Sequence, residues 1–350
     1  MADERPASQV AGPIHEGGRP VGAEPQAHEE GLFEVQYVEA GAAQAVQSKK
    51  SAFVFLRALR ESIALWLALA PALGLIGLLF GSSVIYSVTQ SLGYLPFLGQ
   101  RTLSLDAYRN VVAGADYAAE FWSGLWFSLW VSGAATALST LCALLIVGVW
   151  DLRAPRGGRT AGLLLLNINL SVPHLVWAIG LSLLLAQSGL LARIAAAVGL
   201  IDGPAAFPVL VRDVYGLGII INYVTKETPF LTLVALSILA AQPEAYAVVA
   251  ENLGASRWQR LRYVTLPLAL PGLVSGALLV FAFVFGAYEV PALLGVRYPQ
   301  MLSVLALELF LNPDLRSRAE GMAVSVIMAL TVLLVAVVAR IYGQRAAEEG

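Results

Sequence analysis

Charged side chains are scarce in this sequence of 350 residues: Asp, Glu, Lys and Arg together make up 13% of it, against about a quarter in an ordinary soluble domain. Apolar residues make up 58%, and the mean hydropathy is +0.71. A water-soluble fold of this composition would lack the polar side chains that cover a surface, so a lipid bilayer is the expected solvent. Lys and Arg form no basic stripe, and no nucleic-acid partner is expected.

Side chains that carry chemistry are scarce as well. The one cysteine, Cys142, lies in an apolar run and cannot form a disulfide within the chain. His15 and His28 lie in a polar tail and only His174 lies in an apolar segment, so no His/Cys metal cluster can be assembled. No lysine directly follows a glycine, as a P-loop requires. We therefore expect no catalytic residue, metal or cofactor in this chain, and no ATP hydrolysis by it.

Residues 1–48 differ in composition from the sequence that follows. They are acidic, rich in Gly and Pro, and without apolar periodicity. A segment of this kind cannot bury enough apolar surface to fold alone. We predict a disordered tail over residues 1–48 and a transmembrane domain over residues 49–350.

Six apolar runs are long enough to cross a bilayer, which takes about 20 helical residues. They cover residues 64–92, 124–149, 161–186, 215–240, 266–287 and 322–339. Pro173 in the third run predicts a kink in that helix. The predicted fold class is an all-α membrane protein with about six transmembrane helices.

The distribution of Lys and Arg orients the bundle, because cytoplasmic loops carry an excess of both. If the N-terminus is inside, 12 lie in inner segments: Lys49, Lys50, Arg57, Arg60, Arg153, Arg156, Arg159, Arg257, Arg260, Arg262, Arg340 and Arg345. Seven then lie in outer segments: Arg101, Arg109, Arg193, Arg212, Arg297, Arg316 and Arg318. We therefore predict that both termini are cytoplasmic.

The inner loop over residues 242–265, which we call the elbow, has the pattern of two short helices. Residues at i, i+3, i+4 and i+7 define one face of the first helix: Tyr246, Val249, Ala250 and Leu253. Gly254 can take the left-handed conformation that ends it. Ser256 can cap a second helix that presents Trp258. The elbow therefore presents an apolar knob to a partner at the inner membrane surface.

The elbow resembles the cytoplasmic loop of permeases in binding-protein-dependent ABC importers. That loop carries a Glu-Ala-Ala triplet, a Gly four residues after its last Ala, and an Ile-x-Leu-Pro end. Ala250 matches the last Ala, Gly254 matches the Gly, and Val264, Leu266 and Pro267 match the end. The text LGAS…VTLPLALPG is similar to the group that imports polyamines, sulfate, iron or thiamine, over about residues 60–342.

The resemblance is incomplete at the triplet, because the family Glu and first Ala fall on Val248 and Val249. In the family this carboxylate can pair with a basic group on the ATPase; here it is absent or moved to Glu244 or Glu251. The alternative to a coupling loop is an interfacial amphipathic helix without a partner. The resemblance implies these coupling residues: Glu244, Tyr246, Val249, Ala250, Glu251, Leu253, Gly254, Ala255, Ser256, Trp258, Leu266 and Pro267.

The resemblance also implies the fold, the setting and the partners. The fold would be that of type I ABC importer permeases, in the bacterial inner membrane and among membrane lipid. Two cytoplasmic ATPase subunits would hold ATP and Mg, and a second permease, identical or related, would complete the pathway. An extracytoplasmic binding protein would deliver a small solute, with polyamines among the candidates.

Polar side chains inside the spans mark a second candidate region, because a charge at bilayer depth costs a few kcal/mol. Lys226 and Glu227 fit either a gate on the translocation path or a polar bridge to another helix, and Glu289 fits either a cation contact or a helix end. His174 is expected to hydrogen-bond a neighbouring helix. The candidate path residues are Asn222, Tyr223, Lys226, Glu227 and Glu289.

Two other functions suit a helical membrane protein. A secondary, ion-coupled transporter would use Lys226 and Glu227 as a relay. That class usually shows an internal repeat, which we do not find in this sequence, and it does not explain the elbow. An intramembrane enzyme needs a nucleophile and base, or metal ligands, at membrane depth. His174 has no acidic residue in its own span. The secondary transporter is therefore the alternative that we retain.

Overall fold

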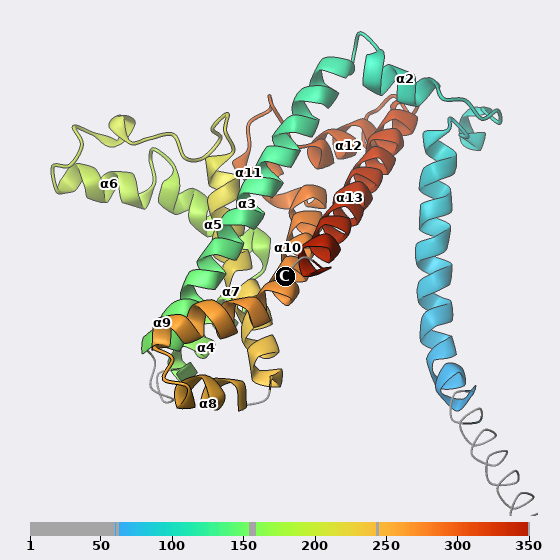
Figure 1. Cartoon of the computed structure of the whole chain (residues 1–350). Coiled ribbons are helices and arrows are strands. Elements are labelled where there is room, and N and C mark those ends of the chain that lie inside the picture. Colours follow the sequence, from blue (N-terminus) through green and yellow to red (C-terminus); the bar gives the residue numbers. More distant parts are fainter. Residues whose placement is uncertain (1–59, 61–62, 154–158, 243–244, 349–350) are drawn as a thin grey trace, which may run out of the picture. The chain divides into compact units, whose positions relative to one another are not determined.

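The computed structural model describes residue 60 and residues 63–153, 159–242 and 245–348, so the predicted tail over residues 1–48 lies outside the described part. The described residues are mostly helical, with no β-strand among them (Figure 1). The chain divides into two compact units, Met1–Leu79 and Phe80–Gly350. In the first unit the described residues belong to an apolar helix that runs from Ile63 to Ser91 and so continues into the second. The packing and the sites described below concern the second unit.

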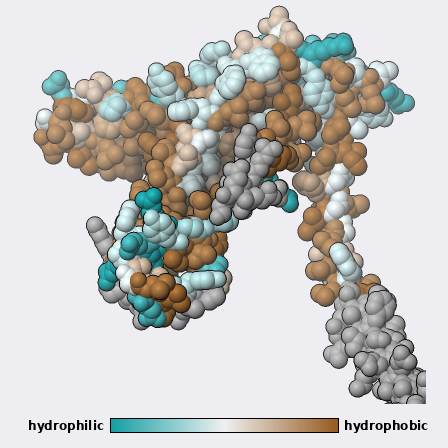
Figure 2. Space-filling view, viewed as in Figure 1, coloured by the Kyte–Doolittle hydropathy of each residue, from teal (hydrophilic) through white to brown (hydrophobic). Residues whose placement is uncertain are grey.

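The described residues contain six helices that are long and apolar enough to cross a membrane, which confirms the predicted number. Their spans are Ile63–Ser91, Ala118–Trp150, His174–Ala197, Leu217–Ala241, Arg257–Gly286 and Ser317–Ile341. The visible surface is apolar over long stretches of helix (Figure 2). This is the surface expected of a chain whose solvent is lipid.

The predicted third helix is in fact broken. Instead of one kinked helix over residues 161–186, the chain forms α4 (Arg159–Ser171) and α5 (His174–Leu185), followed by α6 (Leu190–Ala197). Pro173 has φ −59° and ψ 146°, an extended conformation that ends one helix and starts the next. Proline also lacks the N–H that would continue the hydrogen-bond ladder. The break is therefore sharper than the predicted kink.

The fifth span begins earlier than predicted, because the chain is helical from Arg257 onward. The short helix α9 (Arg257–Arg260) passes into a π-helix, η3 (Leu261–Thr265), and then into α10 (Leu266–Gly286). The N–H of Leu266 bonds the carbonyl of Leu261, five residues back. The wider turn lies just before Pro267, which has no N–H to donate.

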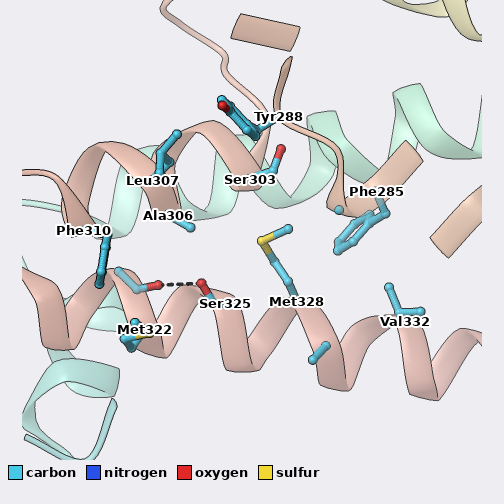
Figure 3. A pocket seen from close by; sticks show the side chains of 13 residues that line it. Phe285, Tyr288, Ser303, Ala306, Leu307, Phe310, Met322, Ser325, Met328 and Val332 are labelled. Atoms are coloured by element: carbon cyan, nitrogen blue, oxygen red, sulfur yellow. Dashed lines mark hydrogen bonds between the residues drawn. The ribbon is translucent and has the colours of Figure 1, made fainter. Parts of the chain in front are cut away.

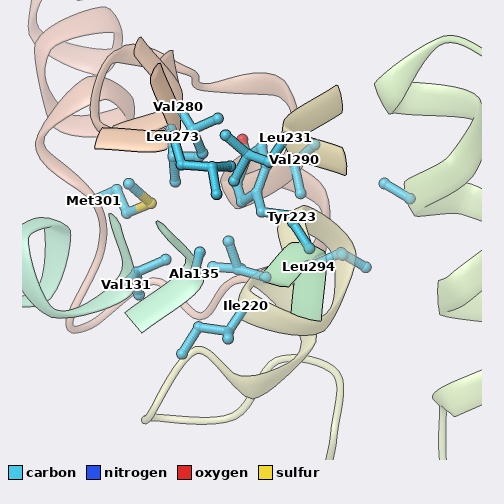
Figure 4. Close-up of a cluster of buried hydrophobic side chains, with 14 of the residues drawn as sticks. Val131, Ala135, Ile220, Tyr223, Leu231, Leu273, Val280, Val290, Leu294 and Met301 are labelled. Carbon is cyan, nitrogen blue, oxygen red and sulfur yellow. The ribbon is translucent and has the colours of Figure 1, made fainter. Parts of the chain in front are cut away.

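The core of the second unit lies between α3 (Ala118–Arg153), α7 (Leu217–Ala241) and α10, which pack against one another. Tyr223 and Leu231 of α7 lie there beside Leu273 and Val280 of α10 (Figure 4). The short helix α11 (Glu289–Leu294) adds Val290 and Leu294 to the same cluster. This packing fixes the buried face of α7, which carries the candidate path residues.

A second cluster joins α2 (Asp106–Ala113), α12 (Leu302–Phe310) and α13 (Ser317–Glu348) to the rest. Between α10, α12 and α13 lies an apolar pocket of about 610 Å³. Phe285, Leu307 and Met328 line it from the three helices (Figure 3). In Figure 1, α2 and α12 lie at one end of the second unit, and the elbow lies at the opposite end. We call the end with α2 and α12 the far end.

Candidate functional site

The elbow forms as the sequence predicts, with a helix, a glycine turn and a second helix. The first helix, α8 (Ala245–Asn252), ends at Gly254, whose φ is +77°. The N–H of Ala255 bonds the carbonyl of Ala250, and the N–H of Gly254 bonds that of Glu251, both at 3.0 Å. These two bonds form a Schellman motif, which requires a left-handed residue at the position of Gly254.

Ser256 starts the second helix with a complete capping box. Its hydroxyl accepts a hydrogen bond from the N–H of Gln259 at 3.3 Å, and the Gln259 side chain accepts one from the N–H of Ser256 at 2.8 Å. Two N–H groups that α9 leaves free are therefore satisfied locally. Leu266 and Pro267 follow the π-helix and are the first two residues of α10. They therefore lie just after the elbow in the chain, at its junction with the fifth span.

The outer surface of the elbow is apolar. Leu253 is 81% exposed, and Tyr246, Val249 and Trp258 are more than half exposed. Ala250, predicted to share their face, is buried against the chain instead. Large apolar side chains that gather on one surface mark a site for a partner.

The elbow carboxylates differ in their surroundings. Glu244 lies outside the described residues. Glu251 forms an ion pair with Arg260 across the elbow, so it joins α8 to α9. Arg257 donates a hydrogen bond to the carbonyl of Leu152 at 3.0 Å, which ties the elbow to the end of α3. Glu251 therefore already has a partner within the chain.

The candidate path residues do not form one cluster. Asn222, Tyr223, Lys226 and Glu227 are buried on α7, whereas Glu289 is exposed at the start of α11. Within the described part of the chain, the Asn222 side-chain atoms and the Tyr223 hydroxyl are buried without a hydrogen-bond partner. A buried polar group without a partner is costly in a membrane.

Lys226 and Glu227 both contact the broken helix. Lys226 Nζ donates to the backbone carbonyls of Asn169 and Val172, each at 2.6 Å. Glu227 Oε1 lies 2.9 Å from His174 Nε2. These contacts fit the polar-bridge interpretation, and they give His174 the helix–helix hydrogen bond predicted for it. The carbonyl partners escaped prediction, although Pro173 signals a free carbonyl four residues earlier, at Asn169.

A polar pocket at the far end also escaped prediction. It has a volume of about 410 Å³, and Arg212, Arg297 and Glu308 are among its lining residues. Arg212 has φ +59°, which is uncommon for a residue with a side chain. Its N–H bonds the carbonyl of Leu294 at 2.8 Å, while the Asp213 carboxylate accepts from the N–H of Tyr215, before α7, and from that of Leu217, its first residue. The loop that holds Arg212 is therefore fixed from both sides.

The sequence matches one protein family and several of its members. The profile of the family described as binding-protein-dependent transport system inner membrane component matches residues 145–347. The inner membrane ABC transporter permease protein YnjC of Escherichia coli K12 is 27% identical over 200 residues, which are 56% of this chain and 36% of that protein. The molybdate/tungstate transport system permease protein WtpB of Thermococcus kodakarensis is 29% identical over 206 residues, 59% of this chain and 73% of that one.

The thiamine transport system permease protein ThiP of Brucella abortus is 27% identical over 268 residues, 74% of this chain and 47% of that protein. The chain therefore covers less than half the length of YnjC and of ThiP.

Solved structures show the same fold. A chain in the crystal structure of a bacterial ABC transporter that imports the acidic polysaccharide alginate has a TM-score of 0.67 at 16% identity, covering 83% of this chain and 98% of that one. A second crystal structure of the alginate transporter, in complex with a pentasaccharide-bound periplasmic protein, gives 0.67 at 17% identity, covering 83% and 97%. The family match spans more than half of the sequence and includes the elbow. The chain therefore belongs to the family of binding-protein-dependent transport system inner membrane components.

Proposed function

We propose that this chain is the transmembrane permease subunit of an ATP-driven ABC importer, which moves a small solute that an external binding protein delivers. The observation that carries the proposal is the elbow, with its Gly254 turn and exposed apolar knob, in a chain with six candidate membrane spans among its described residues. Exposed apolar side chains on a fixed turn of this kind suit the surface of a protein partner. The same observation gives no support to an ion-coupled transporter.

The elbow is suited to transmit motion from an ATPase. Tyr246, Leu253 and Trp258 enter the surface of the partner, and the Schellman turn and capping box hold the two short helices at a fixed angle. ATP binding would close a pair of ATPase subunits around the elbows of two permeases. Arg257 then passes the displacement to the end of α3.

The family assignment places the chain in the inner membrane as a multi-pass protein. We place both of its termini and the elbow in the cytoplasm, which puts the far end outside. The solute remains a class only, because thiamine and molybdate or tungstate, named for two relatives, differ in chemistry. Nothing in the site favours polyamines over these.

Affinity purification from the native host tests the proposal. We expect the parent chain to bring down an ATPase of the ABC class, and the purified complex to hydrolyse MgATP through that ATPase. Leu253→Glu buries a charge in the docking surface, so this variant should lose the ATPase at an unchanged level in the membrane. Leu200→Glu makes the same change at a second highly exposed leucine, in the loop after α6, and should retain it. If Leu253→Glu keeps the ATPase, or the parent never binds one, the proposal is wrong.

A further inference from the structure

Three consecutive residues of α7, Thr225, Lys226 and Glu227, all contact the broken helix. Thr225 Oγ1 accepts a hydrogen bond from Trp177 Nε1 at 2.8 Å, near the start of α5. Lys226 reaches the carbonyl of Asn169 in the last turn of α4 and that of Val172 just after it, and Glu227 reaches His174, the first residue of α5. We call these three residues the clip, since they join both sides of the break to one turn of α7.

The break creates the polar groups that the clip satisfies. An ordinary residue at position 173 would donate its N–H to the carbonyl of Asn169, and Pro173 cannot. That carbonyl accepts instead from the N–H of Val172 at 3.2 Å and from Lys226 Nζ. The carbonyl of Val172 lies beyond the last turn of α4 and also accepts from Lys226. Without Lys226, Val172 would present a bare carbonyl at membrane depth.

The two charges of the clip match the two helix ends. The C-terminus of a helix carries a partial negative charge and the N-terminus a partial positive charge. Lys226 lies at the C-terminus of α4, and Glu227 lies at the N-terminus of α5. Each charge is therefore compensated by the helix end that it faces, which explains how Lys226 can be only 1% exposed.

A simpler sequence would give the same packing at lower cost. Any non-proline residue at position 173 would allow α4 and α5 to join, and an apolar residue would then suffice at position 226. The chain keeps both the break and a buried charge. Pro229 also interrupts the hydrogen-bond ladder of α7, within one turn of Lys226. Costly arrangements of this kind persist where a protein has to move.

The α4 side of the break is connected to the elbow. Arg257 bonds the carbonyl of Leu152 near the end of α3. Two residues earlier, Trp150 packs so closely on α4 that a Cβ atom at Gly162 would lie 2.3 Å from its ring. A displacement of the elbow is therefore passed through the end of α3 to α4. At its other end, α4 is attached to α7 by the clip.

We propose that Thr225, Lys226 and Glu227 position α4 and α5 as two separate bodies, and that the bundle bends at the Val172–Pro173 break when an ATPase moves the elbow. The proposal rests on the proposed function, because it needs the ATPase as the driver. The clip holds both helix ends while the angle between them changes, so that no backbone group is exposed to lipid in either state.

Spin-label distances test the bending directly and need no knowledge of the solute. Nitroxide labels on Leu165→Cys in α4 and Leu183→Cys in α5, both exposed, report the angle across the break. The native cysteine is first removed by Cys142→Ser. In the purified complex we expect the mean distance to shift between the nucleotide-free form and the form trapped with MgATP and vanadate.

Pro173→Ala is the decisive variant, because it restores the N–H that closes the break. We expect this variant to keep its ATPase and to hydrolyse MgATP while the distance shift is lost. Pro271→Ala makes the same substitution within α10, outside the clip, and should keep the shift. If the parent shows no shift, or Pro173→Ala shifts as the parent does, the inference is wrong. A parent that binds no ATPase would instead contradict the proposed function.

A second measurement separates positioning from simple stabilisation. Lys226→Met leaves the carbonyls of Asn169 and Val172 without a charged donor, so the yield of folded complex should fall. Adding Pro173→Ala should restore the yield, since a continuous helix satisfies the carbonyls of Asn169 and Val172 with its own N–H groups, but it should not restore the distance shift. Recovery of both would mean that Lys226 only stabilises the fold. Equal yields of Lys226→Met with and without Pro173→Ala would show that Lys226 is not needed to satisfy the carbonyls at the break.

Discussion

Gly254 carries a conformational demand rather than a steric one within this chain. Its φ is +77°, and a Cβ atom placed there would meet nothing within 4 Å. A residue with a β-carbon pays about 1–2 kcal/mol in the left-handed conformation, and Asn tolerates it better than most. We expect Gly254→Val to lose the ATPase on purification and Gly254→Asn to retain it. Loss in both variants would show instead that the ATPase surface fills the space beside Gly254.

Val248 stands where the related loops carry a glutamate, and it is about half exposed on α8. Replacement by Glu would place a carboxylate on the exposed surface of α8 without disturbing a buried contact. We expect Val248→Glu to leave the amount of bound ATPase unchanged or to raise it, as measured by co-purification from the same membranes. A clear loss would mean that the docking surface has become apolar at this position.

At the scale of elements, patterns that depend only on local chemistry were predictable. Gly254 and Ser256 produce the turn and the cap that their residue types favour. Elements that depend on contacts between distant segments were not. Pro173 predicts a disturbed helix, but the donor that satisfies the carbonyls of Asn169 and Val172 at a full break is Lys226, 57 and 54 residues away in the sequence. The inward turn of Ala250 likewise follows from packing and not from its helical spacing.

The cap of α9 is an element whose contribution can be measured. The Ser256 hydroxyl satisfies the N–H of Gln259, and removing such a cap costs about 1 kcal/mol. We expect Ser256→Ala to speed amide hydrogen exchange over residues 257–260 by roughly fivefold. Ser256→Asp keeps an acceptor at the same position and should exchange like the parent. Equal protection in Ser256→Ala would show that packing, rather than the cap, holds this helix.

At the scale of the whole molecule, the distribution of Lys and Arg predicts an orientation in the membrane. The elbow carries Arg257, Arg260 and Arg262, and the Lys and Arg of the segments assigned to its side number 12 against seven. A cytoplasmic excess of this kind sets the orientation of a multi-pass protein. With this orientation the far end of the second unit, which carries α2 and α12 (Figure 1), would face outward. This direction can be measured in intact cells.

Cysteine labelling in intact cells gives that measurement. In a Cys142→Ser background, Leu200→Cys and Leu253→Cys place thiols at two highly exposed positions, one after α6 and one on the elbow. A maleimide that cannot cross the membrane should label only Leu200→Cys in whole cells. In inverted vesicles stripped of the ATPase it should label only Leu253→Cys, because the elbow is then both outward and uncovered. The reverse pattern would put the elbow outside the cell. ATP-driven motion could not reach it there, and both the importer and the bending at Pro173 would have to be abandoned.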